Sequence, residues 1–191
     1  MNILTSPLPE SIMVNGEFYE INTDFKVWIE IESTFLNNRI SDSEKIVRML
    51  KMCYKTLPKS LPDALYAMMS FYLLSPSENN KTNKKQKRKK VKPIYSFDED
   101  APYIYSAFLS EYGIDLTKEN LHWWQFISLL KGLSDENKFC KIITWRAIDI
   151  DEIKDKSQKK FIRKMKNIYR LKNVKNSYEE EDVVNALEHL F

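Results

Sequence analysis

Apolar side chains occupy nearly every side of one predicted helix in the second half of this chain, residues 121–133. Eight of its thirteen positions are apolar, and the polar ones recur every three residues, at His122, Gln125, Ser128 and Lys131. A helix with so narrow a polar stripe must be buried almost all round, in its own fold or in a partner interface. The segment therefore requires a fold in which other elements surround it.

The residues before this helix indicate where it should begin. Gly113 follows an apolar helical pattern, and glycine favours the left-handed backbone that commonly ends a helix. Asp115 or Thr117 is then expected to cap the next helix, because their side-chain oxygens accept hydrogen bonds from free backbone N–H groups. The sequence thus predicts one helix ending at Gly113 and the apolar helix soon after it.

The chain as a whole predicts a mainly α fold of six to seven helices with one small N-terminal β-hairpin. Asn15 and Gly16 lie between two short β-prone runs, which is the strongest short-range signal for a hairpin. Capping residues indicate where other helices begin. Thr23 or Asp24 is expected to cap a helix reaching about Asn37, and Ser41 or Asp42 one reaching about Thr56. Ser134 or Asp135 is expected to begin a helix that contains Trp145, and residues 149–151 a basic helix reaching about Leu171.

Composition divides the chain into four expected parts. These are a hairpin and helical subdomain at 1–76, a basic disordered linker at 77–93, a helical subdomain with the tryptophan helix at 94–175, and an acidic C-terminal helix at 176–191. The linker carries eight Lys and Arg residues, and blocks of like charge repel and stay disordered. Without those eight, 22 basic residues stand against 27 acidic ones, so the remainder has a net charge of −5.

The linker contains a basic strap, which we define as Lys84, Lys85, Lys87, Arg88, Lys89 and Lys90. Such a strap could contact nucleic-acid phosphates, but it has no aromatic side chains for base stacking. We favour a solvated loop, and nucleic-acid binding stays open. The segment 154–175 has ten basic residues against one acid, and it could face phosphates, an acidic partner or the acidic residues 179–182.

No catalytic, cofactor or metal site is predicted. His122 has no identifiable nucleophile or acid as a companion, so we interpret it as a polar residue beside the core. Three consecutive acids at 98–100 are interpreted as favourable charges at a helix start, because no calcium-loop spacing follows. The chain lacks a glycine-rich phosphate loop, and neither histidine has a second ligand at zinc spacing. We therefore expect a protein that is not an enzyme.

Cys53 and Cys140 are isolated within apolar helical patterns, which favours small buried side chains in a reducing compartment over a disulfide. No apolar run approaches the length of a membrane span. Residues 1–10 lack a basic segment followed by an apolar run, so no secretory signal is expected.

Six motifs together carry a specific family resemblance. They are VNGEFYEINTDF at 14–25, FDEDAPYIY at 97–105, YGIDL at 112–116, LHWWQF at 121–126, LLKGL at 129–133 and IITWR at 142–146. In this set the chain resembles the bacteriophage "gene product fifteen" family over roughly residues 12–171. That family occurs in tailed phages and prophages of Gram-positive bacteria. The resemblance implies a role in tail assembly, in the cytoplasm of the host bacterium.

From the resemblance we expect a tail-assembly chaperone that shields apolar helical segments of the phage tape-measure protein, or another tail protein. Met and aromatic side chains adapt to varied helices, so a groove is predicted from Met68, Met69, Phe71, Trp123 and Phe126. Two other functions stay open: a structural virion subunit of the connector or tail, and a nucleic-acid binder that uses the strap and the basic helix. Self-association is also left open.

Overall fold

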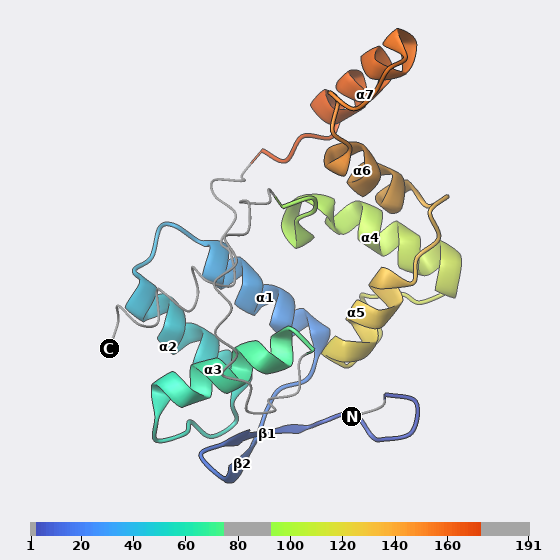
Figure 1. The fold of residues 1–191 in the computed structure, drawn as a ribbon. Coiled ribbons are helices and arrows are strands. Elements are labelled where there is room, and N and C mark those ends of the chain that lie inside the picture. The colour runs from blue at the N-terminus through green and yellow to red at the C-terminus, as the bar shows by residue number, and fades with distance from the viewer. Residues whose placement is uncertain (1–2, 75–92, 173–191) are drawn as a thin grey trace. The chain divides into compact units, whose positions relative to one another are not determined.

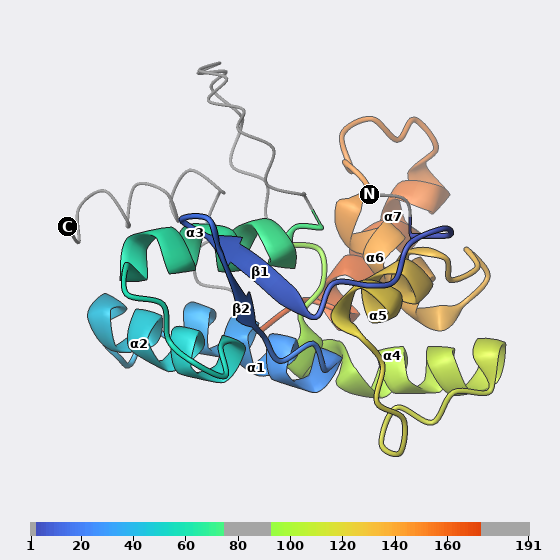
Figure 2. The ribbon, with the colours of Figure 1, turned by 90° about the horizontal axis from the view of Figure 1, so that it is seen from below.

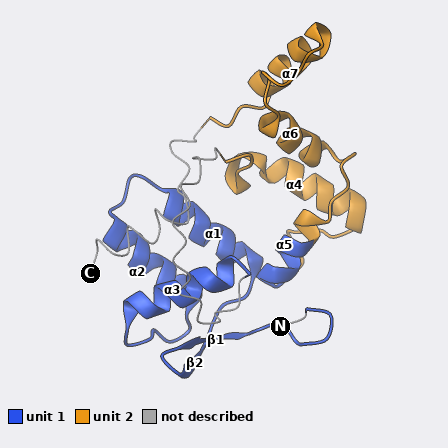
Figure 3. Ribbon diagram, viewed as in Figure 1, with its two compact units in different colours: residues 1–89, 120–128, 178–191 blue, residues 90–119, 129–177 orange. Residues whose placement is uncertain are grey.

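The computed structural model describes residues 3–74 and 93–172, which are mainly helical. Seven helices and a two-stranded hairpin make up these residues, as the sequence predicted (Figure 1). They belong to two compact units (Figure 3). Unit 1 comprises residues 1–89, 120–128 and 178–191, and unit 2 comprises residues 90–119 and 129–177. The basic strap and the predicted acidic C-terminal helix lie outside the described residues.

The N-terminal hairpin of unit 1 consists of β1 (Ser11–Val14) and β2 (Glu17–Glu20), paired antiparallel. Asn15 and Gly16 form the turn, with φ of 51° and 85°. Two successive positive φ values give the twist that matches a hairpin, which confirms the prediction from this dipeptide. The Asn15 Nδ2 donates to Asp63 Oδ2 at 2.8 Å, and β1 contacts α3 (Leu61–Tyr72) (Figure 2).

Two further helices of unit 1 begin where their capping residues predict. They are α1 (Phe25–Leu36) and α2 (Asp42–Cys53). The side chain of Asp24 accepts from the Lys26 N–H at 2.9 Å, and Ser41 Oγ accepts from the Glu44 N–H at 3.3 Å. Both bonds satisfy an N–H group that the helix itself leaves unpaired.

Helix α2 ends at Cys53, three residues before the predicted end. The next residues pair with the strand end instead: Ile21 and Tyr54 form an antiparallel bridge, and the Lys55 N–H donates to Glu20 O at 3.1 Å. The Cys53 carbonyl accepts from the Asn22 N–H at 2.7 Å. An extended partner thus uses backbone groups that a longer helix would need.

Unit 2 contains three complete helices, α4 (Phe97–Tyr112), α6 (Lys138–Ala147) and α7 (Lys156–Ile168), with α6 contacting both α4 and α7. Helix α4 ends at Gly113, whose φ of 68° is left-handed as predicted. Its N-cap is Ser96, so the three acids at 98–100 lie inside the first turn.

Helices α6 and α7 begin later than predicted, because the proposed caps close turns instead. Ser134 Oγ accepts from the Glu136 N–H and Asp149 Oδ1 from the Asp151 N–H, each within a local turn. The true caps follow a few residues on: the side chain of Asn137 accepts from Phe139 N and that of Asp155 from Gln158 N.

Helix α5 (Trp123–Lys131) also begins later than Asp115 or Thr117 would place it. The Phe25 N–H donates to Leu121 O at 3.0 Å, and the Trp123 N–H donates to Thr23 O at 2.7 Å. This extended pairing holds the start of the tryptophan helix in unit 1, whereas the sequence placed residues 94–175 together in one subdomain.

Candidate functional site

The five side chains predicted to line a groove lie in unit 1, but four of them belong to its core. Met68, Phe71, Trp123 and Phe126 are each 5 % exposed or less, and Met69 is half-buried. The predicted groove is therefore not a surface, and this part of the sequence interpretation is wrong. The Met and aromatic residues that suit a binding groove suit a core equally well, because both environments select large apolar side chains.

A stack of aromatic rings fills the space where the groove was expected. Trp28, which has no exposed surface, lies at its centre, with ring-centroid distances of 4.8 Å to Phe71 and 6.1 Å to Trp123. Phe25 and Phe126 stack at 4.6 Å beside it. Offset contacts of this kind add to the area that the rings bury. The cluster joins α1, α3 and the start of α5 within unit 1.

Three tryptophans in this core also satisfy backbone carbonyls. The Nε1–H of Trp123 donates to Tyr72 O at 3.0 Å, and that of Trp124 donates to Phe71 O at 2.9 Å. Both acceptors are at the C-terminal end of α3, where a helix leaves carbonyls unpaired. The Nε1–H of Trp28 donates to Asn22 O at 2.8 Å. The paired tryptophans therefore cap α3 from outside it, which is a structural role.

His122 caps α5 with its ring. Its Nδ1 accepts from the Trp124 N–H at 3.0 Å, while Gln125 Oε1 accepts from the His122 N–H at 3.2 Å. Nε2 lies 3.1 Å from Pro9 O, so the neutral ring carries its proton on Nε2 and donates to that carbonyl. Burial lowers the pKa of His122, which favours this neutral form. The side chain is thus a helix cap beside the core.

Unit 1 is expected to lose stability as the pH falls from about 7.5 to 5.5. The folded pKa of His122 is lowered, so its stabilising contribution is complete above the ordinary histidine pKa of about 6.5 and is lost as protonation places a hydrogen on Nδ1. Hydrogen exchange of unit 1 amides measured across this pH range checks the expectation. His122→Gln should flatten the pH dependence of stability, whereas His189→Gln should leave that dependence unchanged. If the slope is the same in His122→Gln as in the unaltered protein, the pH dependence comes from another group.

The acids at the start of α4 include one that is buried in unit 2. Asp100 is 1 % exposed, and its carboxylate forms two hydrogen bonds with Arg146, at 2.6 Å and 2.9 Å. Asp100 also accepts from the Ser96 N–H at 3.0 Å. The interpretation of residues 98–100 as helix-start charges is therefore incomplete, because Asp100 is one half of a buried ion pair.

Arg146 also donates to two backbone carbonyls of unit 2. Nε donates to Tyr169 O at 2.6 Å, and Nη1 donates to Ile94 O at 3.0 Å. One guanidinium thus connects the start of α4 with residues before it and with the end of α7. The sequence contains a signal for the pair, since Asp100 and Arg146 fall in phase with the buried Ile104 and Ile142.

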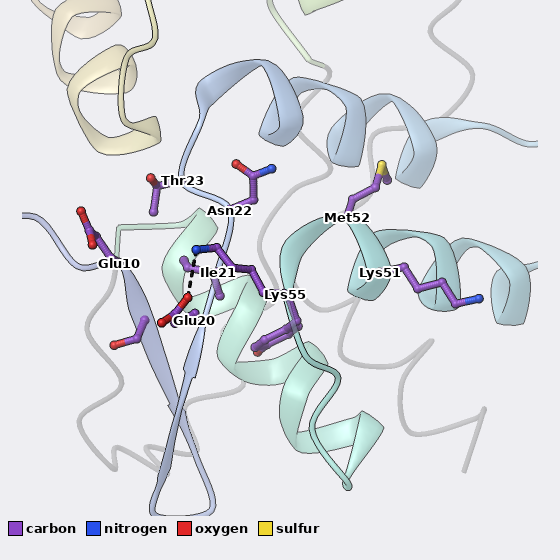
Figure 4. A pocket seen from close by; sticks show the side chains of 10 residues that line it. Glu10, Glu20, Ile21, Asn22, Thr23, Lys51, Met52 and Lys55 are labelled. Carbon is purple, nitrogen blue, oxygen red and sulfur yellow. Dashed lines mark hydrogen bonds and ion pairs between the residues drawn. The ribbon is translucent and has the colours of Figure 1, made fainter.

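A hollow of about 870 Å³ opens in unit 1 beside the end of α2 (Figure 4). Its lining includes Glu20 and Lys55, whose side chains form an exposed ion pair at 2.9 Å, together with Asn22 and Thr23. The hydrogen bond from Lys55 lowers the pKa of Glu20. The hollow follows from the pairing of the strand end with residues 53–55. Its four charged lining residues, Glu10, Glu20, Lys51 and Lys55, give it no net charge.

The outer face of the hairpin exposes two apolar side chains that pair across the strands. Phe18 is 75 % exposed and Met13 is 54 % exposed, and the two are register partners. Their inward neighbour Val14 is buried. Exposed aromatic and Met side chains are common at protein interaction sites.

The two cysteines are free. Cys53 is fully buried, and burial raises the pKa of its thiol. Cys140 is half-buried, and burial is also the main cause of its raised thiol pKa. Raised pKa values keep both groups as thiols, the less reactive form.

Residues 4–171 match the protein family described as Bacteriophage Gp15 protein, a span that contains every helix and strand described above. No curated protein and no solved structure matches the chain. Across residues 3–74 and 93–172, no helix is long and apolar enough to cross a membrane. The same residues contain no group of three or more His, Cys, Asp or Glu side chains arranged to hold a metal ion.

Proposed function

The chain belongs to the bacteriophage Gp15 protein family, and we propose that it is a non-enzymatic tail-assembly chaperone that binds the tape-measure protein in the host cytoplasm. The family supports a role in phage structure or morphogenesis. The observation that carries the proposal is the length of the match, which covers the described residues of both units. The family relationship therefore extends to both units.

The surface chemistry of the described residues supports a protein partner. The most conspicuous aromatic side chain in the core of unit 1, Trp28, is enclosed by other rings, so it acts in packing. Phe18 and Met13 remain exposed on the hairpin. Exposed apolar contacts of this kind recognise apolar surface on another protein.

Co-expression with the tape-measure product of the same phage tests the proposal. The full chain carries an affinity tag, the lysate is treated with nuclease, and the complex is purified in high salt before its mass is measured. We expect the tape-measure protein to co-purify and to stay soluble only when the chain is present. The tail-tube protein of the same phage, expressed in the same way, is the control and should not be captured.

Three outcomes would contradict the proposal. Failure to capture the tape-measure protein removes the chaperone role. Finding the chain in fixed stoichiometry in purified particles favours a structural virion subunit. Binding that disappears with nuclease or falls steeply with salt favours a nucleic-acid binder, because phosphate contacts release counterions.

A further inference from the structure

Helix α7 presents an unpaired basic face. Its sequence from Lys156 to Ile168 contains no Asp or Glu. Its inward side is held within unit 2, because Ile162 is buried and Lys166 Nζ donates to Arg146 O at 2.9 Å. Four outward cations are exposed and form no ion pair with any described residue: Lys156, Lys160, Arg163 and Lys164.

Two apolar side chains lie beside these cations. Phe161 is 50 % exposed and Ile168 is 55 % exposed, although the ring of Phe161 also meets Trp145 edge-on at 6.2 Å. A helix advances about 100° per residue, so residues seven apart lie on the same side. Lys164 falls between Phe161 and Ile168 along the helix. The exposed face therefore combines an apolar pair at a two-turn interval with a row of cations along its flank.

We propose that this face of α7 binds an acidic amphipathic helix of another protein. Packed helices repeat their apolar contacts every seven residues and carry charged residues on the flanks. The spacing of Phe161 and Ile168 matches that repeat, and the flanking cations complement Glu or Asp on the partner. The inference follows from this surface alone and does not depend on the identity of the protein that α7 meets.

Other anionic partners fit the same surface less well. A nucleic-acid backbone would neutralise the cations but would leave Phe161 and Ile168 uncovered. A membrane-bound helix inserts a continuous apolar face into the lipid, and the inward apolar side of α7 is already occupied, with Ile162 buried in unit 2. The combination of apolar spacing and charge favours a helix of protein.

Two synthetic peptides of identical composition provide the probe. One is a three-heptad helix with Leu at the contact positions and Glu on the flanks, and the other has the same residues permuted so that no apolar face forms. Binding to the full chain is followed by fluorescence anisotropy. We expect the ordered peptide to bind at least about tenfold more tightly than the permuted one.

Charge reversal then locates the contact. The double variant Lys160→Glu with Lys164→Glu should bind the ordered peptide about tenfold more weakly or worse. A matching peptide with Lys in place of Glu should regain binding to that variant. Lys51→Glu with Lys131→Glu changes the net charge equally at two other exposed lysines, so it should leave the affinity within about twofold.

Removing the apolar pair tests whether the surface recognises an amphipathic helix or any anionic molecule. The double variant Phe161→Ser with Ile168→Ser should bind the ordered peptide about tenfold more weakly. Ile168→Ser alone replaces it if loss of the contact between Phe161 and Trp145 affects folding. The inference would be overturned if both peptides bound equally well, or if the Lys51 and Lys131 control lost as much affinity as the Lys160 and Lys164 variant. It would also be overturned if Ile168→Ser had no effect on affinity in a folded protein. Duplex DNA or anionic vesicles that bind more tightly than the ordered peptide would also overturn it.

Discussion

Replacing Asp100 by Ala is expected to destabilise unit 2 by about 3–5 kcal/mol. The change leaves the Arg146 guanidinium, whose side chain is only 10 % exposed, without its carboxylate partner. It also removes the acceptor of the Ser96 N–H at the start of α4. A buried charge without a partner costs far more than a lost surface ion pair, because water cannot replace the missing contact.

Hydrogen exchange of the amides in α4 and α6 measures this loss without assuming that the two units unfold together. Glu119→Ala removes a carboxylate at an exposed position of the same unit, so its effect should stay within about 0.5 kcal/mol. Arg146→Lys should also destabilise unit 2, although it keeps the positive charge. An ammonium cannot bond Asp100, Ile94 O and Tyr169 O at the same time in the planar arrangement of a guanidinium.

A double variant tests whether Asp100 and Arg146 stabilise unit 2 through their contact with each other. Asp100→Leu combined with Arg146→Met removes both charges, and it should be less destabilised than the sum of the two single changes. Additive effects would mean that the two side chains stabilise unit 2 independently, which would contradict the contact at 2.6 Å and 2.9 Å as the source of stability.

Replacing Trp28 by Ala is expected to destabilise unit 1 by about 3–5 kcal/mol. The indole has no exposed surface, and its removal leaves a cavity among Phe71, Tyr72 and Trp123. The Asn22 carbonyl also loses the Nε1–H that donates to it. A core this closely filled with rings can collapse only in part around the space.

Urea unfolding followed by near-ultraviolet circular dichroism measures the effect, supported by hydrogen exchange in α1 and α3. Trp28→Phe keeps an aromatic ring but loses the hydrogen bond, so its cost should be smaller than that of Trp28→Ala. Tyr66→Ala is the control, because Tyr66 is 58 % exposed and should change stability by less than about 0.5 kcal/mol. A Trp28→Ala protein as stable as this control would contradict the central position of the indole.

The burial of the predicted groove changes how binding experiments must be designed. Trp123, Phe126, Met68 and Phe71 are core residues, so substitutions there weaken partner capture by unfolding unit 1. Exposed positions such as Phe18, Lys160 and Ile168 can be changed without this effect. A surface is identified only when binding falls while stability stays constant.

Local sequence rules correctly predicted the elements whose cause is local. The Asn15-Gly16 turn, the left-handed Gly113 and the caps at Asp24 and Ser41 follow from residues within a few positions of one another. The same rules misplaced the start of α5 and the end of α2. In both places residues 20–25, at and just after the end of β2, hydrogen-bond to backbone groups that a longer helix would use, as at Leu121 and Lys55.

The amino-acid pattern therefore accounts for which segments are helical and for the need to bury residues 121–133, because periodicity and capping act between near neighbours. Which buried residue contacts which depends on long-range packing. Trp28 meets Trp123 across 95 positions and Asp100 meets Arg146 across 46. A buried aromatic face looks the same in sequence whether it meets a partner or its own chain, and only the folded arrangement distinguishes a core from a groove.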